Sequence, residues 1–179
     1  QLRADLAQLR DQPATTIDGQ RITLFANSGL LADLSPGLAA GAEGLGLYRT
    51  EIPFMLSETF PTEEEQLATY QQVLAAYPDK PVYMRVLDVG GDKPLPYFPY
   101  QEENPALGWR GIRFCLDNSS LLMTQVRAML RAAAGQASLR IMLPMVSSTG
   151  ELRAFHELLD DACAQLGDEG IAVVRPAVG

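Results

Sequence analysis

The sequence has 179 residues, enough for one domain with a hydrophobic core, and 47% of them are hydrophobic, which argues against disorder. Its 22 acidic and 14 basic residues give a formal net charge of −8, so neither nucleic-acid binding nor membrane-surface binding is expected. No apolar stretch is long enough to cross a bilayer and the first residues are not signal-like, so the sequence predicts a cytoplasmic protein.

The first residues read as the end of a helix that leads into a domain. Leucines recur at helical spacing before a proline breaks the pattern. We therefore expect residues 1–15 to be a helical connector and residues 16–179 to be the domain that it enters. Near the start of this domain, an Asp18-Gly19 pair between short runs predicts a hairpin with a two-residue turn.

Four segments of the domain then read as strands, and each is followed by a helical pattern. The strands are short apolar runs, and two of them stop at charged residues, as expected for buried strands that end at a surface. The predicted strands are residues 22–27, 45–49, 81–88 and 139–145. The predicted helices are residues 30–39, 63–77, 119–134 and 149–166.

Two of these helices begin with a capping box. Thr62 precedes Glu65 by three residues, and Ser148 precedes Glu151 in the same way, so each hydroxyl can cap the first turn. The three glutamates at positions 63–65 also suit the positive end of the helix dipole. We interpret them as a solvated first turn rather than a metal site.

The alternation of strands and helices predicts an α/β fold with a mostly parallel sheet. A complete (β/α)8 barrel takes roughly 250 residues, so these segments correspond to about its first four βα units, a partial TIM barrel. Residues 170–179 are again apolar, as if a buried strand were starting, so the chain looks cut from a longer protein. The open strand edges of such a fragment would favour a dimer, a swapped assembly or an aggregate.

The residues that point to function are arginines near the strand ends. Arg49 ends one predicted strand, Arg85 lies near the end of the strand that Asp88 closes, and Arg110 and Arg113 follow a long loop. A barrel brings such strand ends to one mouth, where enzymes of this fold carry their chemistry. Arginine keeps its charge and grips phosphate or carboxylate through two hydrogen bonds, so a small substrate that bears both groups fits.

The same arginines have a structural alternative. Arg49 stands close to Glu51 in the sequence, and Arg85 stands close to Asp88. Each pair could form an ion pair with no ligand.

Residues 90–93, Gly-Gly-Asp-Lys, lie at the charged end of a strand and open a proline-rich loop. A loop of more than about a dozen residues is usually functional or disordered, and its position favours function. The segment lacks the spacing of a nucleotide-binding motif, and its glycines are equally explained by a turn with positive φ.

The other reactive side chains have mostly structural interpretations. His156, the only histidine, falls on a predicted helix, and one histidine builds neither a catalytic triad nor a His/Cys metal cluster. Cys115 and Cys163 lack metal or disulfide spacing and read as small core residues. Trp109 and the aromatic residues near position 98 could pack the long loop.

Four motifs together resemble the enzyme I family, the phosphoenolpyruvate-protein phosphotransferases that start the bacterial phosphotransferase system. They are residues 44–51 (GLGLYRTE), 85–96 (RVLDVGGDKPLP), 102–113 (EENPALGWRGIR) and 139–145 (LRIMLPM). Tyr48 and residues 52–55 are more similar to the nitrogen-related branch of the family than to its sugar branch.

The resemblance implies a barrel that binds phosphoenolpyruvate (PEP). Arg49 and Arg85 would grip the substrate phosphate with Arg110 nearby, and Asp92 and Lys93 would support the same mouth. In the family, PEP gives its phosphoryl group to a histidine of a separate domain. That histidine passes it to the carrier protein HPr or to the nitrogen-branch counterpart of HPr.

The resemblance also implies that part of the site lies outside this sequence. The phosphorylated histidine belongs upstream and His156 does not match it; the Mg²⁺ ligands and an acid cysteine belong beyond Gly179, and neither Cys115 nor Cys163 replaces that cysteine. We therefore expect half a substrate site here, with no catalytic residue and no metal ligand, and no activity from the fragment alone. The whole protein is expected to form a homodimer.

Two other interpretations stay open. The barrel could belong to a pyruvate phosphate dikinase or a PEP synthase, which are similar in this region and share an Arg-Thr-Glu strand. Alternatively, the fragment could be non-catalytic and serve dimerisation or regulation.

Overall fold

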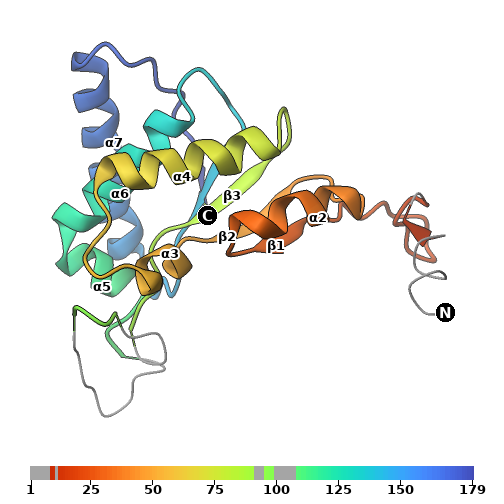
Figure 1. Cartoon of the computed structure of the whole chain (residues 1–179), viewed down its shortest axis with the longest axis horizontal. Coiled ribbons are helices and arrows are strands. Elements are labelled where there is room, and N and C mark those ends of the chain that lie inside the picture. The colour runs from red at the N-terminus through yellow and green to blue at the C-terminus, as the bar shows by residue number, and fades with distance from the viewer. Residues whose placement is uncertain (1–8, 11, 91–94, 99–107) are drawn as a thin grey trace.

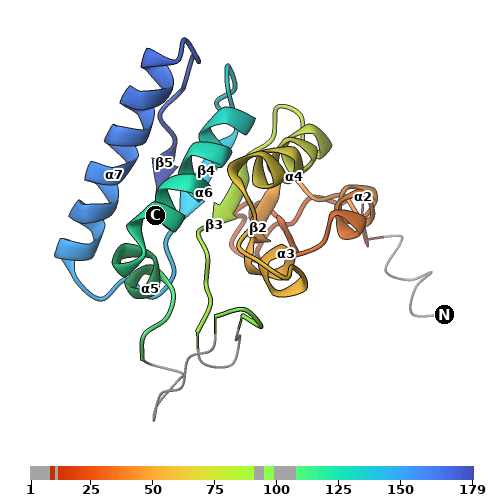
Figure 2. The ribbon, with the colours of Figure 1, turned by 60° about the vertical axis from the view of Figure 1, so that its left-hand side comes forward.

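The computed structural model of the chain describes residues 9–10, 12–90, 95–98 and 108–179. The predicted connector, residues 1–15, falls mostly outside these ranges and stays a prediction. Five parallel strands form a sheet in the order β1-β2-β3-β4-β5. The first three are labelled in Figure 1, and β2 to β5 are labelled in Figure 2. The strands are β1 Ala26–Ser28, β2 Leu45–Arg49, β3 Val82–Arg85, β4 Leu139–Met142 and β5 Ala177–Val178. Each strand pairs with the next in sequence, as in a βα barrel.

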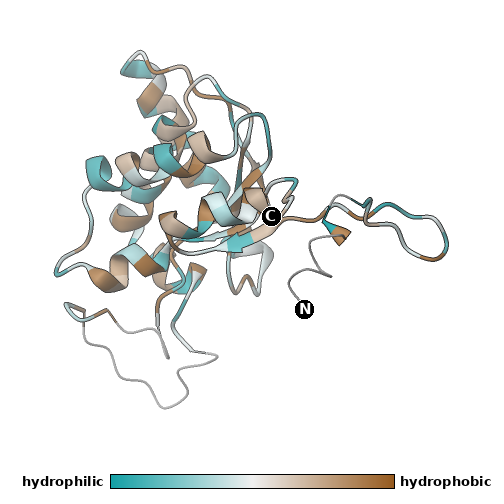
Figure 3. Cartoon of the chain, turned by 45° about the vertical axis from the view of Figure 1, so that its right-hand side comes forward, coloured by the Kyte–Doolittle hydropathy of each residue, from teal (hydrophilic) through white to brown (hydrophobic). Residues whose placement is uncertain are grey.

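Helical segments connect the strands. They are η1 Leu31–Asp33, α2 Leu34–Ala39, α3 Glu51–Leu56, α4 Glu63–Ala76, α5 Ile112–Asp117, α6 Ser119–Ala132 and α7 Thr149–Asp168. Helices α4, α6 and α7 lie in sequence along the sheet, and α6 contacts both of the others (Figure 2). Hydrophobic and hydrophilic residues are mixed along the helices (Figure 3), and the buried residues of α4, α6 and α7 recur at helical spacing, so each of these helices packs through one side.

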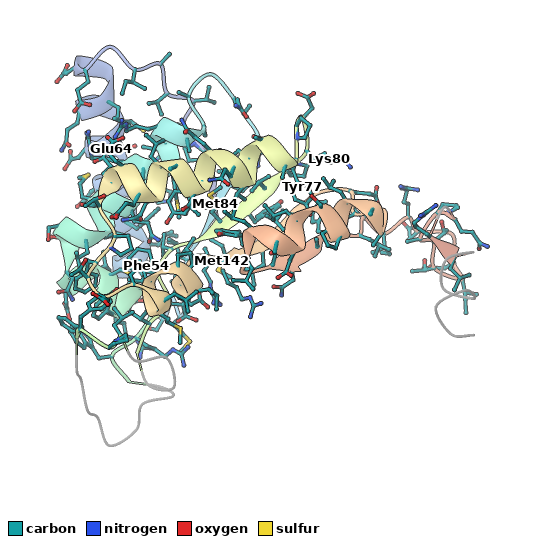
Figure 4. All side chains as sticks on the ribbon, viewed as in Figure 1. Phe54, Glu64, Tyr77, Lys80, Met84 and Met142 are labelled. Carbon is teal, nitrogen blue, oxygen red and sulfur yellow. The ribbon has the colours of Figure 1, made fainter. Side chains whose placement is uncertain are left out.

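The two faces of the sheet differ in burial. On β3, Val82 and Met84 are fully buried, and Met84 lies beneath α4 (Figure 4), whereas Tyr83 and Arg85 are half-buried. The residues of β4 repeat this alternation. Helices thus cover one face, and the other face corresponds to the interior of a barrel. The structure confirms the predicted α/β fold and partial barrel.

Three of the four predicted strands are shorter than the sequence pattern predicted, whereas β2 has the predicted bounds of residues 45–49. The first begins at Ala26 rather than at residue 22, because the amide of Ile22 is used by the preceding hairpin and donates to Ala14 O at 2.8 Å. The third and fourth end at Arg85 and Met142, where the ladder between them stops. The final apolar run pairs with β4 only through the two residues of β5.

The predicted hairpin is present, but its turn is one residue longer than expected. Thr15 and Arg21 form an antiparallel bridge, and Thr16 N donates to Gln20 O at 2.9 Å. Three residues therefore lie in the loop, and only Gly19 has positive φ, at 87°. A turn that ends with glycine in this conformation is the usual three-residue hairpin, whereas the two-residue type I′ turn that an Asp-Gly pair favours would have required positive φ at both central residues.

Both capping boxes are confirmed. Glu65 N donates to Thr62 Oγ1 at 3.3 Å, and Thr62 N donates back to Glu65 Oε2 at 2.8 Å. The equivalent bonds between Ser148 and Glu151 measure 3.2 and 2.9 Å. These bonds begin α4 and α7 at the positions that the sequence indicated.

The glutamates at the start of α4 are not simply solvated, as the sequence had suggested. Glu63 accepts from Arg127 at 2.9 Å and from Arg131 at 2.7 Å, and Glu64, at the start of α4 in Figure 4, lies 2.6 Å from Arg131. These arginines belong to α6, which the helix pattern alone did not place beside α4. Partial burial opposes ionisation of Glu63, but the bonds from Arg127 and Arg131 prevail and lower its pKa.

Candidate functional site

Arg49 and Arg85 are the last residues of β2 and β3, and they are paired in the register of the two strands. Paired residues of adjacent parallel strands project to the same side of the sheet. Both arginines are half-buried. The structure therefore brings these two predicted site residues together at one edge of the barrel.

Arg85 is held by two carboxylates. Its Nη2 bonds to Glu51 Oε1, and its Nη1 lies 3.3 Å from Asp88 Oδ2. Glu51 is fully buried and Asp88 is 4% exposed, so these ion pairs lie inside the protein. The sequence had placed Glu51 beside Arg49, but Glu51 contacts the arginine of the neighbouring strand instead. The suggested ion pair between Arg85 and Asp88 is present.

Arg110 reaches the same carboxylate from the end of the long loop. Its Nη2 lies 3.2 Å from both oxygens of Asp88. Asp88 thus joins Arg85 and Arg110, a link that the sequence did not reveal.

The close approach of the Arg110 segment to the end of β3 depends on Gly90. Its φ is 122°, and a Cβ at this position would lie 2.7 Å from Arg110 Cβ and 2.8 Å from Trp109 O. The interpretation of Gly90 as a positive-φ turn is therefore confirmed, and the absence of a side chain also makes room for the neighbouring backbone.

Arg49 differs from the other two arginines. It forms no ion pair with any part of the chain that the structure describes, and its buried Nε, like that of Arg85, has no hydrogen-bond partner there. Gly29 provides the space beside it, because a Cβ on Gly29 would lie 3.4 Å from Arg49 Nε and Nη2 and 2.8 Å from Ile52 Cγ1. Sequence reasoning missed Gly29; its position directly after β1 was the available signal.

The remaining predicted residues are placed as follows. Asp92 and Lys93 lie outside the described residues. Arg113 lies on α5, where it donates to Gly108 O at 2.9 Å and faces Glu151 at 3.8 Å. The fourth candidate arginine therefore supports the local structure beside α7 and does not join Arg49 and Arg85.

Aromatic side chains pack the described part of the long loop, as the sequence suggested. Trp109 and Phe114 have ring centroids 5.0 Å apart, and Phe98 lies 5.5 Å from Phe114 and 5.8 Å from Phe60. Tyr97 adds a hydrogen bond to Phe54 O at 3.0 Å. This cluster holds Tyr97 and Phe98 of the loop, and Trp109 at its end, against the neighbouring helical segments.

Comparison with known proteins identifies the family. Residues 3–178 match the family described as PEP-utilising enzyme, PEP-binding domain. The chain belongs to this family.

Its relatives include much longer proteins. A phosphoenolpyruvate-dependent phosphotransferase system protein of Salmonella typhimurium is 48% identical over 168 residues, which cover 93% of this chain and 22% of the relative. The phosphoenolpyruvate-protein phosphotransferases of Haemophilus influenzae and Staphylococcus carnosus are 44% and 46% identical, over 94% and 96% of this chain and 29% and 30% of the relatives. The chain therefore spans less than a third of the length of these relatives.

The cysteines and the histidine of this PEP-utilising domain lie in structural positions. Cys115 is buried and donates to Leu87 O at 3.2 Å, and burial together with the charge of Asp88 raises its pKa. Cys163 is half-buried, which also raises its pKa. His156 Nδ1, on α7, lies 3.1 Å from Arg175 Nη2. These surroundings agree with the interpretation of Cys115 as a core residue.

The described residues do not fit a Mg²⁺ ion. No group of three or more possible metal ligands occurs among them. The two carboxylates nearest the arginines, Glu51 and Asp88, are already engaged by guanidinium groups.

Across the described residues, no helix combines the length and the apolar character that a bilayer crossing needs.

Proposed function

We propose that this segment binds PEP, with the phosphate held between Arg49 and Arg85 and with Arg110 nearby. The observation that carries the proposal is the register pairing of Arg49 and Arg85 together with the absence of an ion pair at Arg49 within the described residues. A half-buried guanidinium with an unsatisfied donor is stabilised by an anion that reaches it.

The local charge supports an anionic ligand. Three guanidinium groups face two carboxylates, which leaves one net positive charge in a chain whose formal net charge is −8. Glu51 and Asp88 hold the guanidinium of Arg85 in place before any ligand arrives. Donors that are oriented in advance and partly withdrawn from water stabilise phosphate charge more strongly than mobile donors do.

The chemistry that fits such a site is phosphoryl transfer. Its transition state spreads charge over the phosphoryl oxygens, so catalysis is mainly positioning and cationic stabilisation, which arginines supply. We propose that the segment is part of a PEP-protein phosphotransferase, in which a histidine outside the segment accepts the phosphoryl group and an HPr-like carrier receives it. Mg²⁺ ligands would lie beyond Gly179, and Asp92 and Lys93 would complete the mouth. The whole protein would be a cytoplasmic homodimer.

The test is a binding measurement on the full-length protein. Arg49→Ala and Arg85→Ala should each raise the Kd for PEP by at least about a hundredfold, since a charge-assisted phosphate contact is lost. Arg21→Ala is the matched control, because Arg21 lies in the hairpin before β1, forms its ion pair with Glu43 and is outside the site. Isothermal titration calorimetry gives the Kd of each variant. Unchanged PEP binding in both site variants would remove the proposal.

A further inference from the structure

A buried glutamine lies between the strands that carry the two arginines and the helices behind them. Gln125, on α6, is 1% exposed, and its carboxamide uses its acceptor and both donors. Oε1 accepts from Leu87 N at 2.8 Å, and Nε2 donates to Thr50 Oγ1 at 3.1 Å and to Tyr70 OH at 3.0 Å. Because Leu87 N can only donate, the orientation of the amide is fixed.

Two of the partners of Gln125, Thr50 and Leu87, are each adjacent in the sequence to a charged residue of the candidate site. Thr50 stands between Arg49 and Glu51 in the sequence, and its hydroxyl donates to Arg85 O at 2.7 Å. The other partner, Leu87 N, belongs to the residue before Asp88. One side chain therefore joins the end of β2 to the backbone that follows β3.

We propose that Gln125 is a positioning residue for the PEP site, which sets the separation of Arg49 from Arg85 and of both from Asp88. The inference rests on the proposed function. Gln125 does not contact the substrate, since the sheet lies between its amide and the face that carries the arginines. It acts by holding the two strand ends at one spacing through hydrogen bonds that are shielded from water.

The chemistry of the position explains why an amide is needed. The main-chain N–H of Leu87 needs an acceptor, and the hydroxyl oxygen of the fully buried Thr50 accepts a hydrogen bond. A carboxamide supplies both the acceptor and the donor. A side chain without polar atoms leaves Leu87 N unpaired, so the backbone near Asp88 has to shift to find another acceptor. A small shift is enough to matter, because the two strand ends carry the groups that must fit one phosphate.

Tyr70, the third hydrogen-bond partner of Gln125, offers a matched control. Tyr70 OH donates to Gln66 Oε1 at 3.1 Å, and Gln66 Nε2 donates to Pro61 O at 2.9 Å. These bonds join α4 to its own amino-terminal end and do not touch either strand end. Removing the Tyr70 hydroxyl therefore deletes a buried hydrogen bond of Gln125 but leaves its bonds to Thr50 and Leu87.

The experiment compares Gln125→Met and Tyr70→Phe in the full-length protein by calorimetric titration with PEP and by urea unfolding. Gln125→Met should raise the Kd for PEP by about tenfold or more in the folded protein, because small displacements of phosphate-binding groups are costly. Tyr70→Phe should lower stability and leave the Kd within about twofold. A purely structural role would reduce the number of binding-competent molecules but not their Kd.

A second variant covers the case in which Gln125→Met does not fold. Thr50→Val keeps the shape of the side chain and removes the bonds to Gln125 and Arg85 O, so it should raise the Kd in the same direction. If Gln125→Met, or Thr50→Val in its place, leaves the Kd unchanged while Arg49→Ala weakens binding, Gln125 is not a positioning residue and the proposed function stands. If Arg49→Ala also has no effect, both proposals fail.

Discussion

Arg49 and Arg85 are register partners at the ends of adjacent parallel strands, but only Arg85 is ion-paired among the described residues. The two arginines that we propose to hold one phosphate therefore differ in their contribution to the stability of the fold. Arg85 neutralises Glu51 and Asp88, which are buried, whereas Arg49 neutralises neither. The contribution of each arginine to the free energy of unfolding can therefore be measured separately from its contribution to PEP binding.

Replacing each arginine by alanine should affect stability differently. Arg85→Ala leaves two buried carboxylates without this guanidinium and should lower the free energy of unfolding by about 3–5 kcal/mol. Arg49→Ala breaks no ion pair of the described chain and should change it by less than about 1 kcal/mol. Urea unfolding of the full-length protein, followed by circular dichroism, measures both. Equal losses would contradict the pairing of Arg85 described above.

Gly29→Ala should weaken PEP binding through Arg49. The added methyl group would lie 2.8 Å from Ile52 Cγ1 and 3.4 Å from the Arg49 guanidinium, so one of these side chains must move. We expect the Kd for PEP to rise by roughly tenfold. Gly167→Ala on α7 is the control, since its methyl group meets nothing within 4 Å and alanine is the better helix former. A Kd for Gly29→Ala equal to that of the control would argue against this route.

The Glu63 cluster should make stability depend on pH in the acid range. The pKa of Glu63 is lower in the folded protein than its ordinary value of 4.5, so the stabilisation is fully present above about pH 4.5. It is lost as the pH falls through the folded-state pKa. The stability difference between the unmodified protein and Glu63→Gln should therefore be largest near pH 7 and should vanish at low pH. Thermal unfolding across this range tests it, with the exposed Glu157→Gln as control; a constant difference would contradict the assignment.

The two cysteines should differ in reactivity. Burial raises the pKa of both thiols, and Cys115 is buried whereas Cys163 is half-buried. Iodoacetamide at pH 8 should therefore modify Cys163 slowly and Cys115 only after denaturation, because the thiolate is the reactive form. Peptide mass spectrometry of the labelled protein resolves the two sites. Rapid labelling of Cys115 in the native protein would show that its surroundings open.

Four helices could be derived from the sequence because the signals are local, whereas the short helices α3 and α5 were not predicted. The capping pairs at Thr62 and Ser148 place two helix starts correctly, since each bond spans only three residues. The alternation of strands and helices was sufficient for the parallel sheet. Strand ends were less well predicted, because Ile22 could pair with the hairpin or with the sheet and only the folded chain selects one.

The candidate site was predicted only in part. The arginines at strand ends were visible in the sequence, and the strand order that makes Arg49 and Arg85 neighbours followed from the barrel pattern. The suggested ion pair between Arg49 and Glu51 was wrong. Proximity in the sequence favoured Arg49, but in the folded chain Glu51 contacts Arg85 of the next strand.

The sequence by itself therefore determined the alternation of elements, the helix caps and the residue types at the strand ends, since these depend on neighbours a few positions apart. Only the tertiary structure decided which charged and polar side chains pair with each other. It paired Arg85 with Glu51, linked Asp88 to Arg110, and placed Gln125 between Thr50 and Leu87. Those contacts join residues 22 to 75 positions apart, and a contact at such a separation depends on how the strands and helices pack.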